Sequence, residues 1–127
     1  MKLEHIAINV PDSRAAAEWY AQHLGLKIVV AADASPYMRF ISDGAGSMIE
    51  FYTRTDILPP DYSQIDPFTL HLAFTVEDMA ATRDALVAAG ATVVDEIVTT
   101  PAGDQLLFLR DPWQVPLQIL KRKQAMG

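Results

Sequence analysis

The chain has 127 residues, half of them hydrophobic, and a net charge of −6 with no cysteine. This length predicts a single domain, and the acidic charge argues against a nucleic-acid partner, which requires a basic face. Disulfides and thiolate metal sites are excluded, so a metal would need nitrogen and oxygen ligands. No apolar run approaches the roughly 18 residues of a membrane helix, and we expect a soluble, cytoplasmic protein.

The first half of the chain predicts a strand, a helix and three further strands. His5–Val10 alternates apolar and polar residues, as a half-buried strand does. Asp12 stands where a helix N-cap would, and Gly25 supplies the left-handed stop. The predicted helix spans 13–24, and the strands that follow it span about 26–31, 37–42 and 47–53.

The second half repeats this order at an offset of 66 residues. His71–Val76 lies over His5–Val10, and Asp78 lies over Asp12. A helix over 79–89, with Ala81, Leu86 and Ala89 at helical spacing, precedes strands at about 92–98, 105–110 and 115–121. The repeat predicts one α+β domain over 1–127, built from two βαβββ modules at about 1–55 and 68–121. A Pro-rich linker at about 56–67 joins the modules.

Four residues that can bind metals stand at symmetric positions in the two copies. Because alternate residues of a strand face opposite sides, each of them lies opposite its strand's apolar residues. A single histidine, glutamate or glutamine on a strand is more often a residue without a metal. His23 has no counterpart in the second copy and is interpreted as a surface residue. The two candidates in the first copy are 45 residues apart and those in the second copy are 47 apart, and this similar spacing favours a shared metal site. The four candidate ligands are His5, Glu50, His71 and Gln118.

Their neighbours on the same strand faces predict a pocket. These residues have mainly apolar side chains, which favours a small organic ligand over a highly charged one. The predicted pocket residues are Asn9, Met48, Tyr52, Ala73 and Leu120.

Four motifs make the chain resemble the vicinal oxygen chelate superfamily, which includes glyoxalases, extradiol dioxygenases and bleomycin-resistance proteins. They are Leu-Glu-His-Ile-Ala-Ile-Asn-Val-Pro-Asp at 3–12, Met-Ile-Glu-Phe-Tyr at 48–52, Leu-His-Leu-Ala-Phe-Thr-Val-Glu-Asp at 70–78 and Phe-Leu-Arg-Asp-Pro-Trp-Gln-Val-Pro-Leu-Gln-Ile-Leu at 108–120. The resemblance implies curled mixed sheets around a metal-binding cleft, ligands on the first and fourth strand of each module, and a homodimer.

The resemblance also implies chemistry, with one departure. The fourth ligand of the family is usually glutamate, and Gln118 cannot act as a base. Glu50, the only carboxylate of the set, is the candidate for proton transfer. We expect a divalent ion (Zn, Ni, Mn, Fe or Co) and a glyoxalase-like lyase or isomerase that acts on a small carbonyl compound. The alternatives are an Fe(II)-dependent dioxygenase and a non-enzymatic protein that binds a small ligand.

Overall fold

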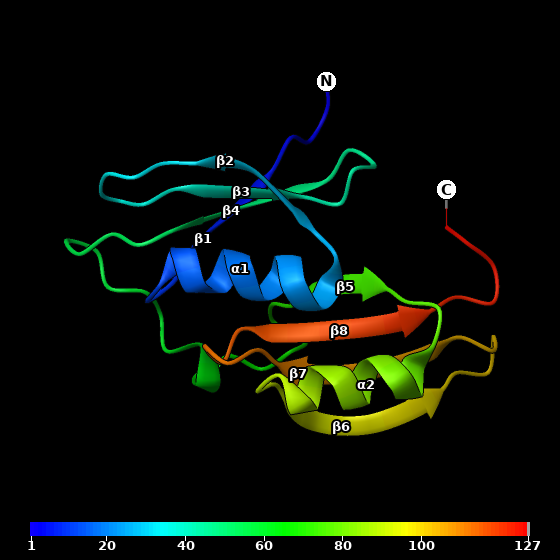
Figure 1. The fold of residues 1–127 in the computed structure, drawn as a ribbon. Coiled ribbons are helices and arrows are strands. Elements are labelled where there is room, and N and C mark those ends of the chain that lie inside the picture. The colour runs from blue at the N-terminus through cyan, green and yellow to red at the C-terminus, as the bar shows by residue number, and fades with distance from the viewer. Residues whose placement is uncertain (127) are drawn as a thin grey trace. The chain divides into compact units, whose positions relative to one another are not determined.

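The computed structural model describes residues 1–126, and the chain divides into two compact units, residues 1–60 and residues from Asp61 onward. Each unit holds a four-stranded mixed sheet with one helix on it, as Figure 1 shows. The prediction of an α+β fold with two βαβββ modules is therefore confirmed. The single-domain organisation of the two modules stays a prediction.

Unit 1 contains a sheet in the order β1-β4-β3-β2, in which β1 is parallel to β4 and the other pairs are antiparallel. Helix α1 packs against β2, β3 and β4. The elements are β1 (Ile6–Asn9), α1 (Ser13–Leu24), β2 (Lys27–Ala31), β3 (Arg39–Ser42) and β4 (Met48–Tyr52). The core between helix and sheet includes Ile8, Tyr20, Ile41 and Phe51, all buried.

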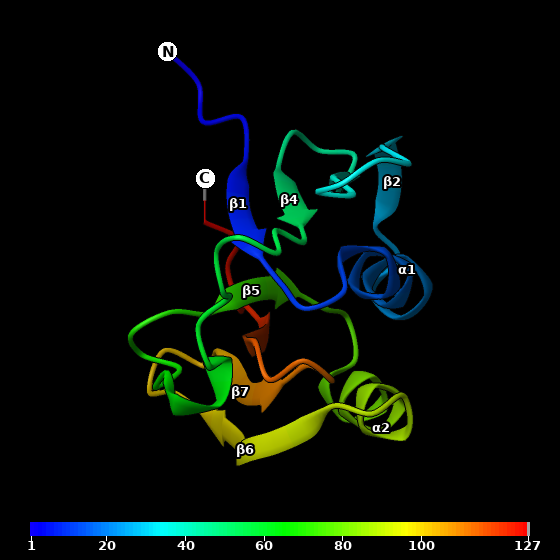
Figure 2. The same cartoon turned by 90° about the vertical axis from the view of Figure 1, so that its left-hand side faces the viewer.

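Unit 2 repeats this topology, with the order β5-β8-β7-β6 and a single parallel pair, β5 and β8. In Figure 2 each helix is seen nearly end-on beside its own sheet. The elements are η1 (Tyr62–Gln64), β5 (Leu72–Thr75), α2 (Met79–Ala88), β6 (Thr92–Thr99), β7 (Gln105–Arg110) and β8 (Pro116–Lys121). The core includes Leu86, Leu107, Leu109, Leu117 and Ile119.

Both helices begin where the sequence predicts. The side chains of Asp12 and Asp78 each accept a hydrogen bond from the backbone N–H three residues later, at 3.0 Å. Such N-caps satisfy a free donor of the first turn, and Gly25 ends α1 with a φ of 72°. Within α2, Met79 and Leu86 are buried, whereas Ala81 is exposed.

In the segment 56–67, predicted as a linker, one part is hydrogen-bonded within unit 1 and another within unit 2, and its role as a linker stays a prediction. Its first part is tied to unit 1, because the Asn9 Nδ2 donates to the Ile57 carbonyl at 2.8 Å. Its second part belongs to unit 2, where the Arg110 guanidinium donates to the carbonyls of Tyr62 at 2.8 Å and Ile65 at 2.9 Å. The boundary between the units follows Pro60.

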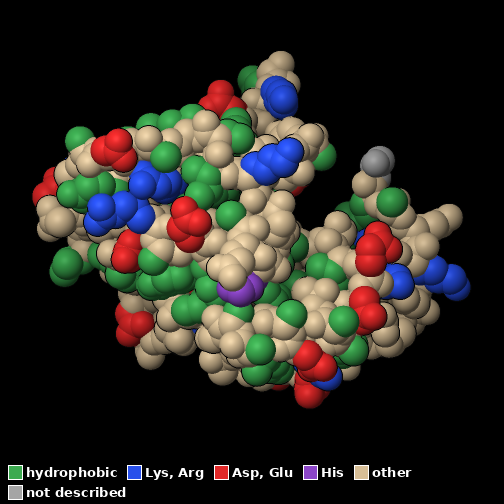
Figure 3. Space-filling view, in the orientation of Figure 1, with side chains coloured by type: hydrophobic (Ala, Val, Ile, Leu, Met, Phe, Trp, Pro, Cys, Tyr) green, Lys and Arg blue, Asp and Glu red, His purple; other side chains and the backbone are tan. Residues whose placement is uncertain are grey.

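On the face of the described residues shown in Figure 3, acidic and basic side chains are interspersed and form no continuous basic surface. Within residues 1–126, neither helix has the length and apolar character to cross a bilayer.

Candidate metal centre

His5 and Glu50 lie on the face of the unit 1 sheet that is turned away from α1. Glu50 alternates along β4 with Phe51, whose side chain is completely buried under the helix. The strand register pairs Glu50 with Ala7 in β1 and with Phe40 in β3. His5 directly precedes β1 and has the parity of Ala7, so the sequence-based assignment of faces agrees with the register.

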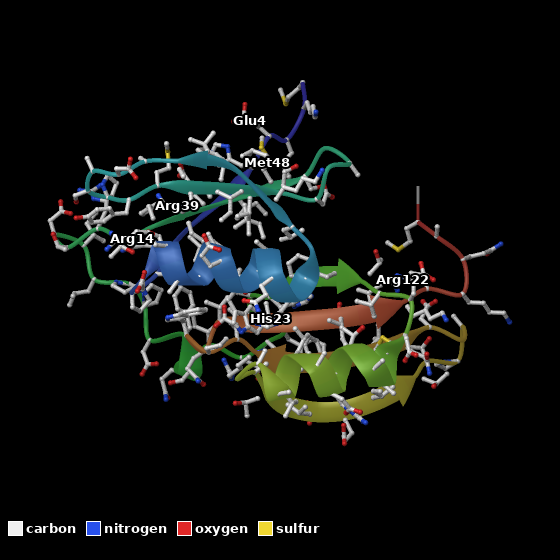
Figure 4. All side chains as sticks on the ribbon, viewed as in Figure 1. Glu4, Arg14, His23, Arg39, Met48 and Arg122 are labelled. Carbon is white, nitrogen blue, oxygen red and sulfur yellow. The ribbon has the colours of Figure 1, made fainter. Side chains whose placement is uncertain are left out.

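Two neighbours hold the His5 imidazole. Its ring meets the ring of Phe40 edge-on, with centroids 4.9 Å apart and planes at 88°. Its Nδ1 lies 2.9 Å from the Glu4 Oε1. Because a carboxylate only accepts, Nδ1 donates and Nε2 is left as the nitrogen that can bind a metal. Figure 4 shows Glu4 and Met48 at the end of the sheet where β1 and β4 begin.

His71 and Gln118 have the same relationship in unit 2. Gln118 is buried, with 9% of its surface exposed, and is paired with Ala73 in β5 and Phe108 in β7. The His71 ring meets the Phe108 ring with centroids 5.3 Å apart and planes at 75°. Its Nδ1 lies 2.6 Å from the Pro67 carbonyl oxygen, so Nδ1 again donates and Nε2 is again left for a metal.

The turns that lead into β4 and β8 are also the same. In each, an aspartate Oδ1 accepts from the backbone N–H groups two and four residues later. The bonds run from Ala45 at 2.8 Å and Ser47 at 3.0 Å to Asp43, and from Trp113 at 2.8 Å and Val115 at 2.9 Å to Asp111. Donation from Ala45, and then from Ser47, lowers the pKa of Asp43 below its ordinary value. These turns set the register that places Glu50 and Gln118.

Each unit thus places two of the four predicted ligands on one face of its sheet, one imidazole and one side-chain oxygen. Within residues 1–126 no group of three or more His, Asp or Glu side chains is gathered into a metal site. The donor types nonetheless fit a divalent ion, since both imidazoles have Nδ1 engaged and the remaining donors are oxygens. That all four bind one ion stays a prediction.

The predicted pocket residues fall into two groups. Met48, Tyr52 and Asn9 lie on the Glu50 face of unit 1, where the Asn9 amide is engaged with the backbone of Ile57 and Arg54. Ala73 and Leu120 lie on the Gln118 face of unit 2. Leu120 also lines a pocket of about 570 Å³ at the ends of β5 and β8, together with Thr75, Val76, Glu77, Lys121, Arg122, Ala125 and Met126. The role of all five as a substrate pocket stays a prediction.

Sequence reasoning missed the two phenylalanines that contact the histidines. The signal was an offset of 68 residues, which places Phe40 over Phe108, Asp43 over Asp111 and Glu50 over Gln118. The third histidine, His23, lies on α1 with its ring centroid 5.4 Å from that of Trp19.

Comparisons with known proteins identify the family of this chain. The family model of the Glyoxalase/Bleomycin resistance protein/Dioxygenase superfamily matches residues 2–119. A probable lactoylglutathione lyase from Vibrio cholerae is 26% identical over 131 aligned residues, covering 98% of this chain and 93% of the relative.

Solved structures show the same fold. A glyoxalase family protein from Bacillus cereus superposes with a TM-score of 0.82 at 18% identity, covering 95% of this chain and 93% of that one. TnmS3, an antibiotic binding protein from a Streptomyces species, superposes with a TM-score of 0.70 at 16% identity, covering 97% of both chains. With a family model that matches nearly the whole chain and a fold shared with these structures, this protein belongs to the Glyoxalase/Bleomycin resistance protein/Dioxygenase superfamily.

Proposed function

We propose that this protein is a divalent-metal-dependent lyase or isomerase that acts on a small carbonyl compound. The observation that carries the proposal is the repeated donor pair. Each unit presents an imidazole whose Nδ1 is already engaged and a side-chain oxygen on the same sheet face. The superfamily binds small-molecule substrates or ligands, and the relative from Vibrio cholerae is named a probable lactoylglutathione lyase.

His5, Glu50, His71 and Gln118 would hold the ion. Two neutral imidazoles, one carboxylate and one carboxamide carry a formal charge of −1, so the centre keeps a net positive charge on a divalent cation. Zinc, nickel, manganese, iron and cobalt all accept such nitrogen and oxygen donors. When bound, the ion would supply Lewis-acid polarisation of a substrate carbonyl and stabilise negative charge on its oxygen.

Glu50 is assigned the proton transfer. It is the only carboxylate of the set, and the carboxamide of Gln118 has no lone pair basic enough to take a proton from carbon. In the proposed reaction the Glu50 carboxylate accepts a proton from the carbon beside the carbonyl and returns it to a neighbouring atom. The electron pair of the broken C–H bond is held meanwhile on the carbonyl oxygen.

A second candidate rests on the composition of the donor set. His5, His71 and Glu50 are two histidines and one carboxylate, the combination that holds iron in non-haem Fe(II) oxygenases. This candidate predicts oxygen consumption with catechol substrates under Fe(II). An oxygen electrode therefore separates it from the lyase or isomerase, which consumes no oxygen.

Metal analysis tests the site first. Protein purified without added metal or a histidine tag is expected to hold about one equivalent, whereas His5→Ala and His71→Ala hold close to none. His23→Ala is the matched control, because His23 is the third histidine and lies on α1 beside Trp19. Equal metal content in all four proteins would exclude the site.

Turnover tests the reaction next. We expect metal-loaded protein to convert a hemithioacetal or to epimerise a carbon beside a carbonyl, and Glu50→Gln to lower the rate by about 10²–10⁴-fold, as for loss of a general base. Tight ligand binding with no chemical change in the ligand would instead indicate a non-enzymatic binding protein.

A further inference from the structure

We propose that Phe40 and Phe108 are positioning residues that fix the imidazole rings of His5 and His71 for metal binding. The inference rests on the proposed metal site and adds two residues to it that have no donor atom. Each phenylalanine belongs to the third strand of its unit, far in sequence from the histidine that it contacts.

The contact in unit 1 crosses the sheet. Strand β4 lies between β1 and β3, and Phe40 in β3 is the register partner of Glu50. The Phe40 ring therefore reaches the His5 ring over the strand that carries the oxygen donor, with centroids 4.9 Å apart. The planes stand at 88°, an arrangement that aromatic quadrupoles favour.

The contact in unit 2 has the same construction. Strand β8 lies between β5 and β7, and Phe108 is the register partner of Gln118. Phe108 is itself fixed, because only 9% of it is exposed and the Phe68 ring packs on it with centroids 5.1 Å apart. Its ring meets the His71 ring at 5.3 Å.

Each imidazole thus has two restraints that act in different directions. The hydrogen bond at Nδ1 holds one edge of the ring, to Glu4 for His5 and to the Pro67 carbonyl for His71. The phenylalanine packs against the ring and restricts its rotation about the side chain. A ring already held in its binding orientation loses less freedom when a metal binds, which raises affinity. The Nδ1 acceptor differs between the two units, whereas the contact between phenylalanine and histidine is the same in both.

The test compares Phe108→Leu and Phe40→Leu with the wild type in two measurements. The first is the imidazole ¹⁵N spectrum of metal-free protein, which reports the share of the tautomer protonated at Nδ1. The second is a Zn²⁺ titration. We expect each leucine variant to show less of that tautomer at its own histidine and to bind Zn²⁺ about tenfold more weakly, the lower end for loss of a group that orients a ligand.

Two kinds of variant make the result specific. Phe108→Tyr and Phe40→Tyr keep the ring and should restore both readouts. Phe74→Leu is the matched control, because Phe74 pairs with the buried Ile119 on the opposite face of the unit 2 sheet. It should leave both readouts within about twofold of the wild type, and circular dichroism checks that every variant is folded.

The inference is overturned if the leucine variants behave like Phe74→Leu, or if the tyrosine variants fail to restore what leucine removes. If one leucine variant fails to fold, the leucine variant in the other unit and both tyrosine variants still test the inference. Absence of binding in the wild type of Zn²⁺ and of the other four candidate ions would overturn the proposed function. The ¹⁵N spectra, taken without metal, would still decide whether the phenylalanines fix the imidazoles.

Discussion

Asp111 closes the β7–β8 turn with the same pair of hydrogen bonds that Asp43 makes in the β3–β4 turn. In both, Oδ1 accepts from the backbone two and four residues later, and the aspartate N–H donates to the carbonyl four residues later. The two turns differ in burial, since Asp111 is 1% exposed and Asp43 lies at the surface. This difference allows the same interaction to be tested in two environments.

Asp111→Ala should destabilise the protein far more than Asp43→Ala. The substitution leaves the N–H groups of Trp113 and Val115 without their acceptor, and each buried unsatisfied donor costs about 1–3 kcal/mol. At the exposed turn water replaces the carboxylate. Urea unfolding should give a loss of about 2–4 kcal/mol for Asp111→Ala and less than half of that for Asp43→Ala. Equal losses would contradict the role of burial.

Acid should weaken the β3–β4 turn in a defined direction. Donation from the Ala45 and Ser47 backbones holds the pKa of Asp43 below its ordinary value. A lowered folded-state pKa contributes stability above the unfolded-state pKa of about 3.9, and the contribution disappears as pH falls through the lowered value. As the pH is lowered from neutral to below the pKa of Asp43, the free energy of unfolding of Asp43→Asn should therefore fall less than that of the wild type. Parallel stability curves for the two proteins would rule the effect out.

The turns also differ at the position where the backbone is left-handed. Gly46 has a φ of 114°, and its counterpart in the other turn, Gln114, has a φ of 71°. A side chain in that region costs about 1–2 kcal/mol, partly offset by the greater unfolded-state freedom of glycine. Gln114→Gly should thus stabilise the protein by about 0.5–1 kcal/mol, and Gly46→Ala should destabilise it by at least a similar amount. Thermal melts that show the same sign for both would contradict this account.

Arg110 should control the segment that supports His71. Its guanidinium donates to the carbonyls of Tyr62, Ile65 and Gln114, which anchors the chain just before Pro67. Arg110→Met should release this segment, so that amide exchange at Ile65 becomes faster and Zn²⁺ binding becomes weaker. Arg122→Met is the control, because Arg122 pairs with Asp104 elsewhere in unit 2. Unchanged exchange at Ile65 in Arg110→Met would show that the anchor is not needed.

Much of the fold follows from local signals in the sequence. Alternating residues locate the strands, and Asp12 and Asp78 mark the helix starts, because these features act over a few residues. The parity of the four candidate ligands is likewise a local property. The offset of 66 aligns the first strand and the helix start of each copy, whereas Gly25 and Gly90 at the helix ends are 65 residues apart and Phe40 and Phe108 are 68 apart.

The features that were missed depend on long-range pairing. Phe40 contacts His5 only because β3 pairs with β4 in a particular register. The alternation of apolar and polar residues within β3 does not indicate that register. Likewise, Arg110 donates to the carbonyl of Ile65, which lies 45 residues earlier in the chain. Periodicity describes each strand alone and carries no information on such partners.

Gln118→Glu should make the protein more dependent on metal for its stability. The substitution keeps the size of the side chain but places a carboxylate where 9% of the residue is exposed, so the metal-free variant should be less stable than the wild type. A cation bound by this residue would neutralise the added charge, and Zn²⁺ should then bind at least about tenfold more tightly, which corresponds to about 1.4 kcal/mol. Because a ligand stabilises the folded state in proportion to the logarithm of its affinity, the rise in Tm on adding Zn²⁺ should be larger for Gln118→Glu than for the wild type, and smaller for Glu50→Gln. The same rise in Tm in all three proteins would mean that neither residue binds the ion. A larger rise in Gln118→Glu with an unchanged rise in Glu50→Gln would mean that Gln118 is a ligand and Glu50 is not.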